Sequence, residues 1–224
     1  KTIQSSLEIE GNTLSIEQIT DLFDNKRVLA PKKDIQEVKN AIEVYQKIDT
    51  YKYLNVKSIL SAHKTLMKGL IDSPGLFRKN SVGIVKGDQL TQIAPPSSRV
   101  HGLVSNLLSY LKDGEDLLLI KSCVFHYEFE FIHPFIDGNG RMGRLWQTLI
   151  LKEYSPIFEF LPIETIIKER QQEYYNALNR SDKQGKSTIF IEFMLEVIDD
   201  SLTEILKTQG VVLTQSDRID HYRQ

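Results

Sequence analysis

The stretch HPFIDGNGRMGR, residues 133 to 144, decides how this chain is interpreted. It places one histidine, one aspartate, two arginines and three glycines within twelve positions. The apolar-periodic stretch EDLLLIKSCVFHYEFEFI precedes it, and a second one, LWQTLILKEY, follows. A polar, glycine-interrupted loop between two helices, with arginines opening the second helix, is typical of an anion site at a helix N-terminus.

The rest of the chain has the composition of an ordinary globular protein. Its 224 residues are 41% hydrophobic and 26% charged, enough to bury the core of one or two domains. The net charge of −2 gives no reason to expect general binding to nucleic acid or to a membrane. The single Cys123 excludes an internal disulfide and favours a reducing compartment, so we predict a cytoplasmic location.

Most of the chain shows helical periodicity. Ser15 and Gln18 form a capping box before a first apolar stripe, and Asn55 and Ser98 are predicted to cap two later helices. Further helices are predicted at about 32–48, 116–133, 140–153, 163–180 and 187–206. Only SVGIV and LTQIA, on either side of KGDQ, alternate like strands, which predicts a hairpin at about 81–94. The predicted fold class is all-α, a helical bundle with one β-hairpin.

The chemistry of the central loop is that of a nucleotide-phosphate site. Gly138, Asn139 and Gly140 directly precede a helix, where backbone amides converge on an anion and the helix dipole adds positive potential. Arg141 and Arg144 are three residues apart, so they share one helical face. Both guanidinium groups can bind phosphate oxygens through two nitrogens.

Two more residues of the loop supply a metal ligand and a base. Asp137 is a hard oxygen ligand beside the glycines, which suggests Mg²⁺. His133, with an ordinary pKa of about 6.5, suits a base that takes a proton from a hydroxyl nucleophile. A capped helix with surface arginines would explain any one of these residues. Seven of them together favour the site.

The same residues resemble the signature loop of Fic domains, H-P-F-x-[D/E]-G-N-G-R-x-x-R, at every fixed position. GLFRKNSVGIV and IAPPSSRV are similar to the family's flap hairpin and the proline pair after it. EYYNAL resembles the tyrosine-bearing segment near the nucleotide base. The resemblance covers about residues 6 to 200 and implies a Fic-type helical bundle with a β-hairpin flap.

The resemblance also implies an activity, the transfer of AMP from ATP to a hydroxyl side chain of a target protein. It makes His133 the base, Asp137 the Mg²⁺ ligand and the Gly138–Gly140 backbone the holder of the α-phosphate. Arg141 and Arg144 would bind the remaining phosphates, Arg144 the γ-phosphate. Kinase-like relatives carry lysine where this chain has Gly140, so glycine favours nucleotidyl transfer.

Three aromatic and polar positions complete this prediction. Phe135 is expected to pack under the loop rather than contact ligand. Tyr175 is predicted to stack on adenine while Tyr174 packs in the core. Some relatives carry an asparagine where Asp182 stands in this chain, so the other contacts to the base stay open.

A second informative stretch is SSLEIEGNTL, residues 5 to 14. By itself it is an acidic helix end closed by Gly11. It also resembles the inhibitory motif S-x-x-x-E-G-N of some Fic proteins, with Ser6, Glu10, Gly11 and Asn12 at the matching positions. In that motif the glutamate pairs with the second signature arginine, here Arg144, in the place of the γ-phosphate. A hydrogen bond to a charged group contributes about 1.5–3 kcal/mol, roughly 10- to 150-fold in an equilibrium.

The resemblance therefore predicts an autoinhibited protein AMP-transferase, which could also remove AMP as at least one relative does. We expect an inhibitory segment at 1–30, a catalytic core at 31–206 and a polar tail at 207–224 that could lead into a further domain. The target protein is expected to dock on the flap near Val82–Ile93, and the oligomeric state stays open. The alternative is a regulatory module that binds a nucleotide without transferring it, and any contact with nucleic acid would require a domain beyond this chain.

The remaining histidines and the cysteine have simpler interpretations. His126 and His63 lie in apolar stripes and are expected to be structural, since nothing at ligand spacing completes a metal site. His101 and His221 are expected to be exposed. Cys123 is expected to be buried and inert.

Overall fold

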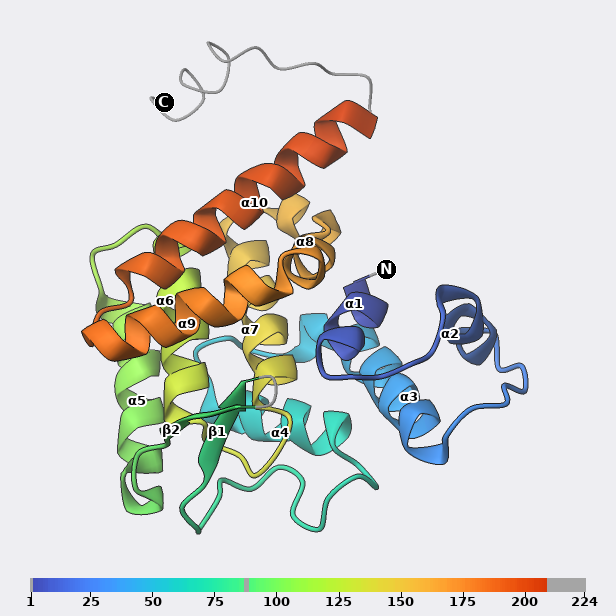
Figure 1. Ribbon diagram of the computed structural model, residues 1–224, viewed down its shortest axis with the longest axis horizontal. Helices are drawn as coiled ribbons and strands as arrows, with labels where there is room; N and C mark the ends of the chain where they lie inside the picture. The colour runs from blue at the N-terminus through green and yellow to red at the C-terminus, as the bar shows by residue number, and fades with distance from the viewer. Residues whose placement is uncertain (1, 87–88, 209–224) are drawn as a thin grey trace.

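Two helices, α6 (Leu118–Ile132) and α7 (Asn139–Tyr154), run through the centre of the molecule (Figure 1). The computed structural model describes residues 2–86 and 89–208. A helix that is apolar around most of its circumference is stable only when other elements cover it. Residues of α7 are buried almost without interruption from Arg141 to Leu151. α6 and α7 pack on each other and separate two hydrophobic clusters.

The first cluster is built by the N-terminal half of the chain. It joins one side of α6 and α7, through residues such as Phe129 and Trp146, to the preceding helices. These helices are α1 (Thr2–Ile9), α2 (Ile16–Phe23), α3 (Lys32–Gln46), α4 (Val56–Leu66) and α5 (Ser97–Asp113), with the 3₁₀ turn η1 (Ile48–Thr50). α1 lies between the two clusters, because Leu7 contributes to the first and Ile9 to the second.

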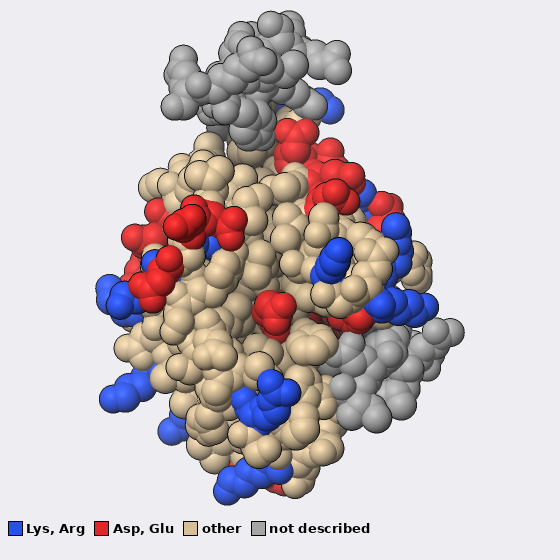
Figure 2. Space-filling model, turned by 90° about the vertical axis from the view of Figure 1, so that its left-hand side faces the viewer, with Lys and Arg blue, Asp and Glu red and all other residues tan. Residues whose placement is uncertain are grey.

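The second cluster lies on the other side of α6, around Cys123 and Tyr127. It is covered by η2 (Pro156–Phe160), α8 (Ile163–Glu169), α9 (Gln171–Gln184) and α10 (Thr188–Thr208). α9 and α10 lie side by side at one end of the molecule, and the hairpin lies toward the opposite end (Figure 1). On the face drawn in Figure 2, acidic and basic side chains both occur in small separate groups with uncharged surface between them, so neither sign dominates this face.

The helix starts show which capping signals in the sequence were reliable. The capping box of Ser15 and Gln18 is confirmed, and so is the cap of Asn55, whose side chain accepts from the backbone of Lys57. The prediction for Ser98 was wrong, because α5 already begins at Ser97 after Pro96. Proline presets the backbone for the start of a helix, so no side-chain cap forms there.

The prediction of one helix over 163–180 was also wrong. The helix breaks at Arg170, whose backbone leaves the helical region and whose side chain turns toward α10. Its guanidinium bonds Glu196 and Asp200 and lies 5.0 Å from the ring centroid of Phe193. These tertiary contacts fix a break that helical periodicity cannot reveal.

The β-strands lie where alternation predicts them. β1 (Gly83–Lys86) pairs antiparallel with β2 (Gln89–Ile93), with an irregular register between Ile84 and Val85. The predicted tail at 207–224 falls outside the described residues from position 209 onward. No helix in the described part of the chain combines the length and the apolar character needed to cross a membrane.

Candidate nucleotide site

The loop between α6 and α7 turns on two left-handed residues. His133 ends α6 with φ of 49°, and its backbone N–H still donates to the carbonyl of Phe129 at 3.0 Å. Gly138 caps the start of α7 with φ of 83°, a conformation that glycine adopts at no steric cost. A Cβ atom at Gly138 would also lie 2.7 Å from Met67 Sδ. The loop therefore holds the His133 side chain and the N-terminus of α7 beside each other.

The loop is closed from within by Asn139. Its Oδ1 accepts from the backbone N–H of Phe135 at 2.9 Å, and its Nδ2 donates to the carbonyl of the same residue at 3.0 Å. Phe135 is fully buried under the loop. The side chain of Asn139 is thus used internally, which leaves the helix N-terminus itself, at Asn139 and Gly140, to face an anion.

His63 on α4 supports the loop from below. Its ring stacks on Phe135 with centroids 3.6 Å apart. Nδ1 accepts from the backbone N–H of Gly75 at 2.8 Å, so Nε2 carries the proton and donates to the carbonyl of Asp137 at 3.0 Å. Burial lowers the pKa of His63 to about 4, which keeps this arrangement neutral. The sequence predicted a structural histidine, and its contact with the loop was not foreseen.

Arg78 holds the loop from the side of the hairpin. Its guanidinium is buried and donates to four backbone carbonyls, those of Asn80, Pro95, Ile132 and His133. The backbone N–H of Arg78 donates to the carbonyl of Pro134 at 2.9 Å. Arg78 thus ties the segments on both sides of the hairpin to the end of α6. Sequence reasoning missed it, because an arginine between two glycine-containing turns carries no signal of burial.

The side chain of His133 has the protonation state of a base. Nδ1 lies 3.4 Å from the carbonyl of Glu130, which only accepts, so the proton belongs on Nδ1. Nε2 then carries the lone pair. Burial lowers the pKa of His133 to about 4, and the charge of Arg78 acts in the same direction. The imidazole is therefore neutral at pH 7.

His133 lines a cavity of about 230 Å³ together with most of the predicted site. The lining includes the N-terminus of α7, the loop and three residues of α9, Tyr174, Tyr175 and Leu178. The main polar and aromatic lining residues are Glu10, Glu130, His133, Asp137, Gly138, Asn139, Gly140, Arg144, Tyr174 and Tyr175. Gly83 of β1 also lines it, which places the hairpin at its rim.

Arg144 is held by α1 and by the turn that follows it. Its Nε donates to Ser6 Oγ at 3.0 Å, and its Nη2 donates to Ser6 O at 2.9 Å and to Glu10 Oε1 at 2.6 Å. The guanidinium is 2% exposed, whereas Glu10 keeps 31% of its side chain exposed. Burial alone would lower the pKa of Arg144, but the charge and hydrogen bond of Glu10, together with the charges of Tyr174 and Glu130, outweigh it and raise that pKa. Gly11 follows with φ of 89°, which turns the chain away from the site.

Arg141 does not line the cavity. Its Nη1 donates to Glu37 Oε1 at 3.3 Å, and its Nη2 donates to Asp137 Oδ1 at 3.2 Å. Glu37 is a buried residue of α3 that also accepts from Asn12 Nδ2 at 2.8 Å. No pattern in the sequence indicates a role for Glu37, because it lies beside the apolar stripe of its helix rather than within a motif.

Asp137 is the candidate metal ligand. Its Oδ1 accepts from the N–H of Gly138 and from Arg141, and half of its side chain is exposed toward solvent. No group of three or more His, Cys, Asp or Glu side chains that could hold a metal occurs among the described residues. Mg²⁺ bound with a nucleotide takes one or two carboxylates, phosphate oxygens and water. A single carboxylate at the mouth of this cavity fits that pattern.

Two tyrosines of α9 have different environments. Tyr174 is buried, and its hydroxyl lies 3.0 Å from Nε2 of His126. Tyr175 is half-buried at the cavity, and its hydroxyl accepts from Gln171 at 3.2 Å. Tyr174 packs in the core as expected but also lines the cavity, and Tyr175 is the more exposed of the two. Asp182 accepts from the hydroxyl of Tyr127 at 3.0 Å.

The other histidines and the cysteine lie where their patterns suggested. Both ring nitrogens of His126 have side-chain partners, and burial lowers its pKa to about 3. Burial raises the pKa of the Cys123 thiol to about 12, which leaves it unreactive at neutral pH. His101 is exposed with its ring against Phe77, and His221 falls outside the described residues.

Comparison with known proteins agrees with this geometry. Residues 53–151 match the model of the Fic/DOC family. This stretch contains the whole loop and most of α7. The chain is 29% identical over 185 residues to a probable protein adenylyltransferase of Aquifex aeolicus, covering 80% of this chain and 53% of the relative. It is 25% identical to the protein adenylyltransferase fic-1 of Caenorhabditis elegans, covering 97% of this chain and 42% of that protein. The chain thus spans about half the length of these relatives.

Solved structures show the same fold. A Fic family protein from Desulfovibrio desulfuricans aligns with a TM-score of 0.90 and 48% identity, over 96% of this chain and 66% of that one. Fic-1 from Caenorhabditis elegans aligns with a TM-score of 0.75 and 20% identity, over 93% of this chain and 62% of that one. The prediction of a helical Fic fold is therefore confirmed.

Proposed function

We propose that this chain is a protein adenylyltransferase that moves AMP from ATP to a hydroxyl side chain of a target protein. The observation that carries the proposal is the neutral His133, with its Nε2 lone pair in a cavity lined by the start of α7 and by Arg144. A site that only binds a nucleotide has no use for a base beside the phosphates. The names of the relatives support the same activity.

In the proposed reaction the target hydroxyl oxygen attacks the α-phosphorus of ATP. The hydroxyl proton passes to Nε2 of His133, and pyrophosphate leaves with the electrons of the broken P–O bond. The backbone at Gly138–Gly140 and the dipole of α7 stabilise the charge on the α-phosphate. Asp137 would hold Mg²⁺, which neutralises charge on the leaving phosphates. Tyr175 is proposed to stack on the adenine.

The proposal includes autoinhibition by residues 1–30. Glu10 occupies the guanidinium of Arg144, which is the proposed partner of the γ-phosphate. Nη2 of Arg144 has two N–H groups, and Ser6 O and Glu10 Oε1 accept from this nitrogen already. A phosphate oxygen can bind there only by displacing one of them, so ATP either displaces Glu10 or binds with its triphosphate misplaced. The same carboxylate could align a water molecule against an AMP-modified target, so AMP removal belongs to the proposal as a second activity.

The hairpin is proposed to dock the target. Among the described residues β1 and β2 form a sheet of two strands, and Gly83 lies at the rim of the cavity. An extended peptide that pairs with an outer strand satisfies its backbone groups and brings a hydroxyl toward His133. We also keep the division into an inhibitory segment at 1–30 and a catalytic core at 31–206, and the cytoplasmic location, as proposals.

A labelling experiment tests the activity. The Glu10→Gly variant is incubated with ATP labelled on the α-phosphate and with cell lysate, and modified bands are analysed by mass spectrometry. We expect an added AMP on a serine, threonine or tyrosine of a protein band, and none with the matched variant Glu10→Gly/His133→Ala. Nucleotide binding without label in any band would support the alternative, a nucleotide-binding regulatory module.

A further inference from the structure

One buried carboxylate, that of Glu37 on α3, joins the N-terminal segment to the signature helix. Its Oε2 accepts from Asn12 Nδ2 at 2.8 Å, and its Oε1 accepts from Arg141 Nη1 at 3.3 Å. A carboxylate removed from water is stable only with such partners. Lys33 lies 3.9 Å away but is largely exposed, so it contributes little. Glu37 therefore depends on one partner from each side.

The contacts continue from Arg141 to the loop. Its Nη2 donates to Asp137, whereas its buried Nε has no hydrogen-bond partner in the described part of the chain. Within residues 2–86 and 89–208, the partners of the guanidinium are thus Glu37 and Asp137. Asn12, Glu37, Arg141 and Asp137 form an unbroken line of polar contacts from the turn after α1 to the candidate metal ligand.

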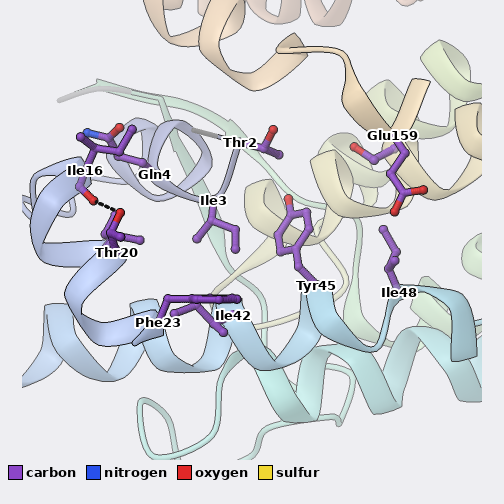
Figure 3. A pocket seen from close by; sticks show the side chains of 12 residues that line it. Thr2, Ile3, Gln4, Ile16, Thr20, Phe23, Ile42, Tyr45, Ile48 and Glu159 are labelled. Atoms are coloured by element: carbon purple, nitrogen blue, oxygen red, sulfur yellow. Dashed lines mark hydrogen bonds between the residues drawn. The ribbon is translucent and has the colours of Figure 1, made fainter. Parts of the chain in front are cut away.

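The packing of α1 makes these contacts important for its position. A cavity of about 430 Å³ lies along α1, where Thr2, Ile3 and Gln4 face residues of α2 and α3 such as Phe23 and Ile42 (Figure 3). This side of the helix is incompletely packed. The segment is held instead on its other side and near its C-terminal end. Buried apolar side chains pack there, Ser5 and Ile9 bond Thr165 of α8 and Gln171 of α9, and Ser6, Glu10 and Asn12 make the polar contacts with the site.

We propose that Glu37 is a positioning residue that gives the N-terminal segment a second hold on the site. Glu10 holds Arg144 directly, and Asn12 holds Arg141 through Glu37. Loss of either the Glu10–Arg144 contact or the Asn12–Glu37 contact loosens the whole N-terminal segment. Docking of the segment therefore affects the positions of both Arg141 and Arg144. The regulatory meaning of this link rests on the proposed function, but the link itself does not.

Hydrogen exchange of the backbone amides of residues 2–12 in the full chain measures the link without any assay of activity. Asn12→Ala removes a hydrogen bond to a charged group and is expected to speed this exchange about tenfold. Glu37→Met removes both acceptors at similar side-chain length and is expected to do the same. In the Glu37→Met background, Asn12→Ala should add clearly less than it does alone, because its charged partner is already absent and only its bonds with the carbonyl of Asp34 and the N–H of Leu14 are left to lose.

Asp34→Asn is the matched control. Among the described residues the Asp34 carboxylate, one turn earlier on α3, accepts from the backbone and side chain of Thr13, and the variant keeps the backbone carbonyl that accepts from Asn12. In that background Asn12→Ala should keep its full effect. A full additional acceleration in the Glu37→Met background would overturn the proposal. If Glu37→Met does not fold, Glu37→Gln serves instead, because an amide oxygen can accept from only one of the two donors at that bridge.

In the transfer assay, we expect a higher rate of AMP transfer for Asn12→Ala than for wild type, with Glu10 intact in both. Slower transfer there, with faster exchange, would reject the inhibitory role while leaving the link in place.

Discussion

The signature loop and the N-terminal segment meet at Arg144 but are held in different ways. The loop is fixed by a redundant set of contacts, with Asn139 closing it from within, His63 beneath it and Arg78 beside it. The segment is a helix of eight residues with a cavity along one side. Its polar contacts with the site pass through Ser6, Glu10 and Asn12.

This difference separates the proposed catalytic loop, which many contacts hold, from a segment that we propose can open. Local opening requires little free energy where few contacts must break, and such regions are the usual carriers of regulation. Loss of a contact in the loop should therefore remove activity, whereas loss of a contact in the segment should increase it. The predictions below test this opposite response.

The largest expected effect comes from the base. His133→Ala in the Glu10→Gly background should lower AMP transfer by about 10²- to 10⁴-fold, the usual contribution of a general base. ATP affinity, measured by calorimetry, should stay nearly unchanged, because the start of α7 and Arg144 hold the nucleotide. Transfer within a few-fold of the parent variant would remove His133 from the role of base.

The second effect has the opposite sign. Glu10→Gly should raise the transfer rate by about 10- to 150-fold, the equilibrium value of one hydrogen bond to a charged group. The rise requires Arg144, so Glu10→Gly/Arg144→Ala should return to a low rate, as expected for coupled residues. ADP lacks the contested phosphate and should bind wild type and Glu10→Gly about equally. Equal transfer by wild type and Glu10→Gly on the same target would reject autoinhibition.

The same comparison explains what the sequence could predict. The loop is local, because its glycines, arginines and histidine lie within twelve residues, so their types and spacing define the site. The supports of the loop are not local. His63 and Arg78 come from 70 and 55 residues before His133, and neither carries a pattern that distinguishes it from any other buried residue.

Helix boundaries show the same limit. Ser15 and Asn55 act as caps through neighbours two or three residues away, and both were predicted correctly. The break at Arg170 depends on α10, about 26 to 30 residues later, and was missed. Glu37 was missed for the same reason, since its two partners lie 25 and 104 residues away in the chain.

The third prediction concerns how the rate of AMP transfer depends on pH through His133. Burial lowers the pKa of His133 from 6.5 to about 4, so the base is neutral above that pH and is lost only as the pH falls through 4. Transfer by Glu10→Gly should stay nearly constant from pH 8 down to pH 5.5. A histidine with an unshifted pKa would lose about nine tenths of its neutral form at pH 5.5. The charged groups that influence the ring are Arg78, Glu10 and Asp137, and the first of these lowers its pKa. A rate that halves near pH 6.5, with the fold intact by circular dichroism, would contradict this environment.

The smallest expected effect tests one contact between the loop and the N-terminal segment, that of Gly140 with Glu10. Gly140 has a backbone that alanine can adopt, but a Cβ atom there would overlap Glu10 Oε1 and lie 3.1 Å from Arg144 Nη1. Because the carboxylate is the end of a flexible side chain, Gly140→Ala should displace Glu10 rather than the helix. We expect exchange of the backbone amides of residues 2–12 to become about fivefold faster, the equivalent of about 1 kcal/mol. In the Glu10→Gly background the same substitution should have no effect on this exchange.

Gly102→Ala is the matched control, since a Cβ atom there meets nothing within 4 Å. Faster exchange caused by Gly140→Ala in both backgrounds would show that the substitution disturbs α7 itself, and that Glu10 is not the contact that limits residue 140.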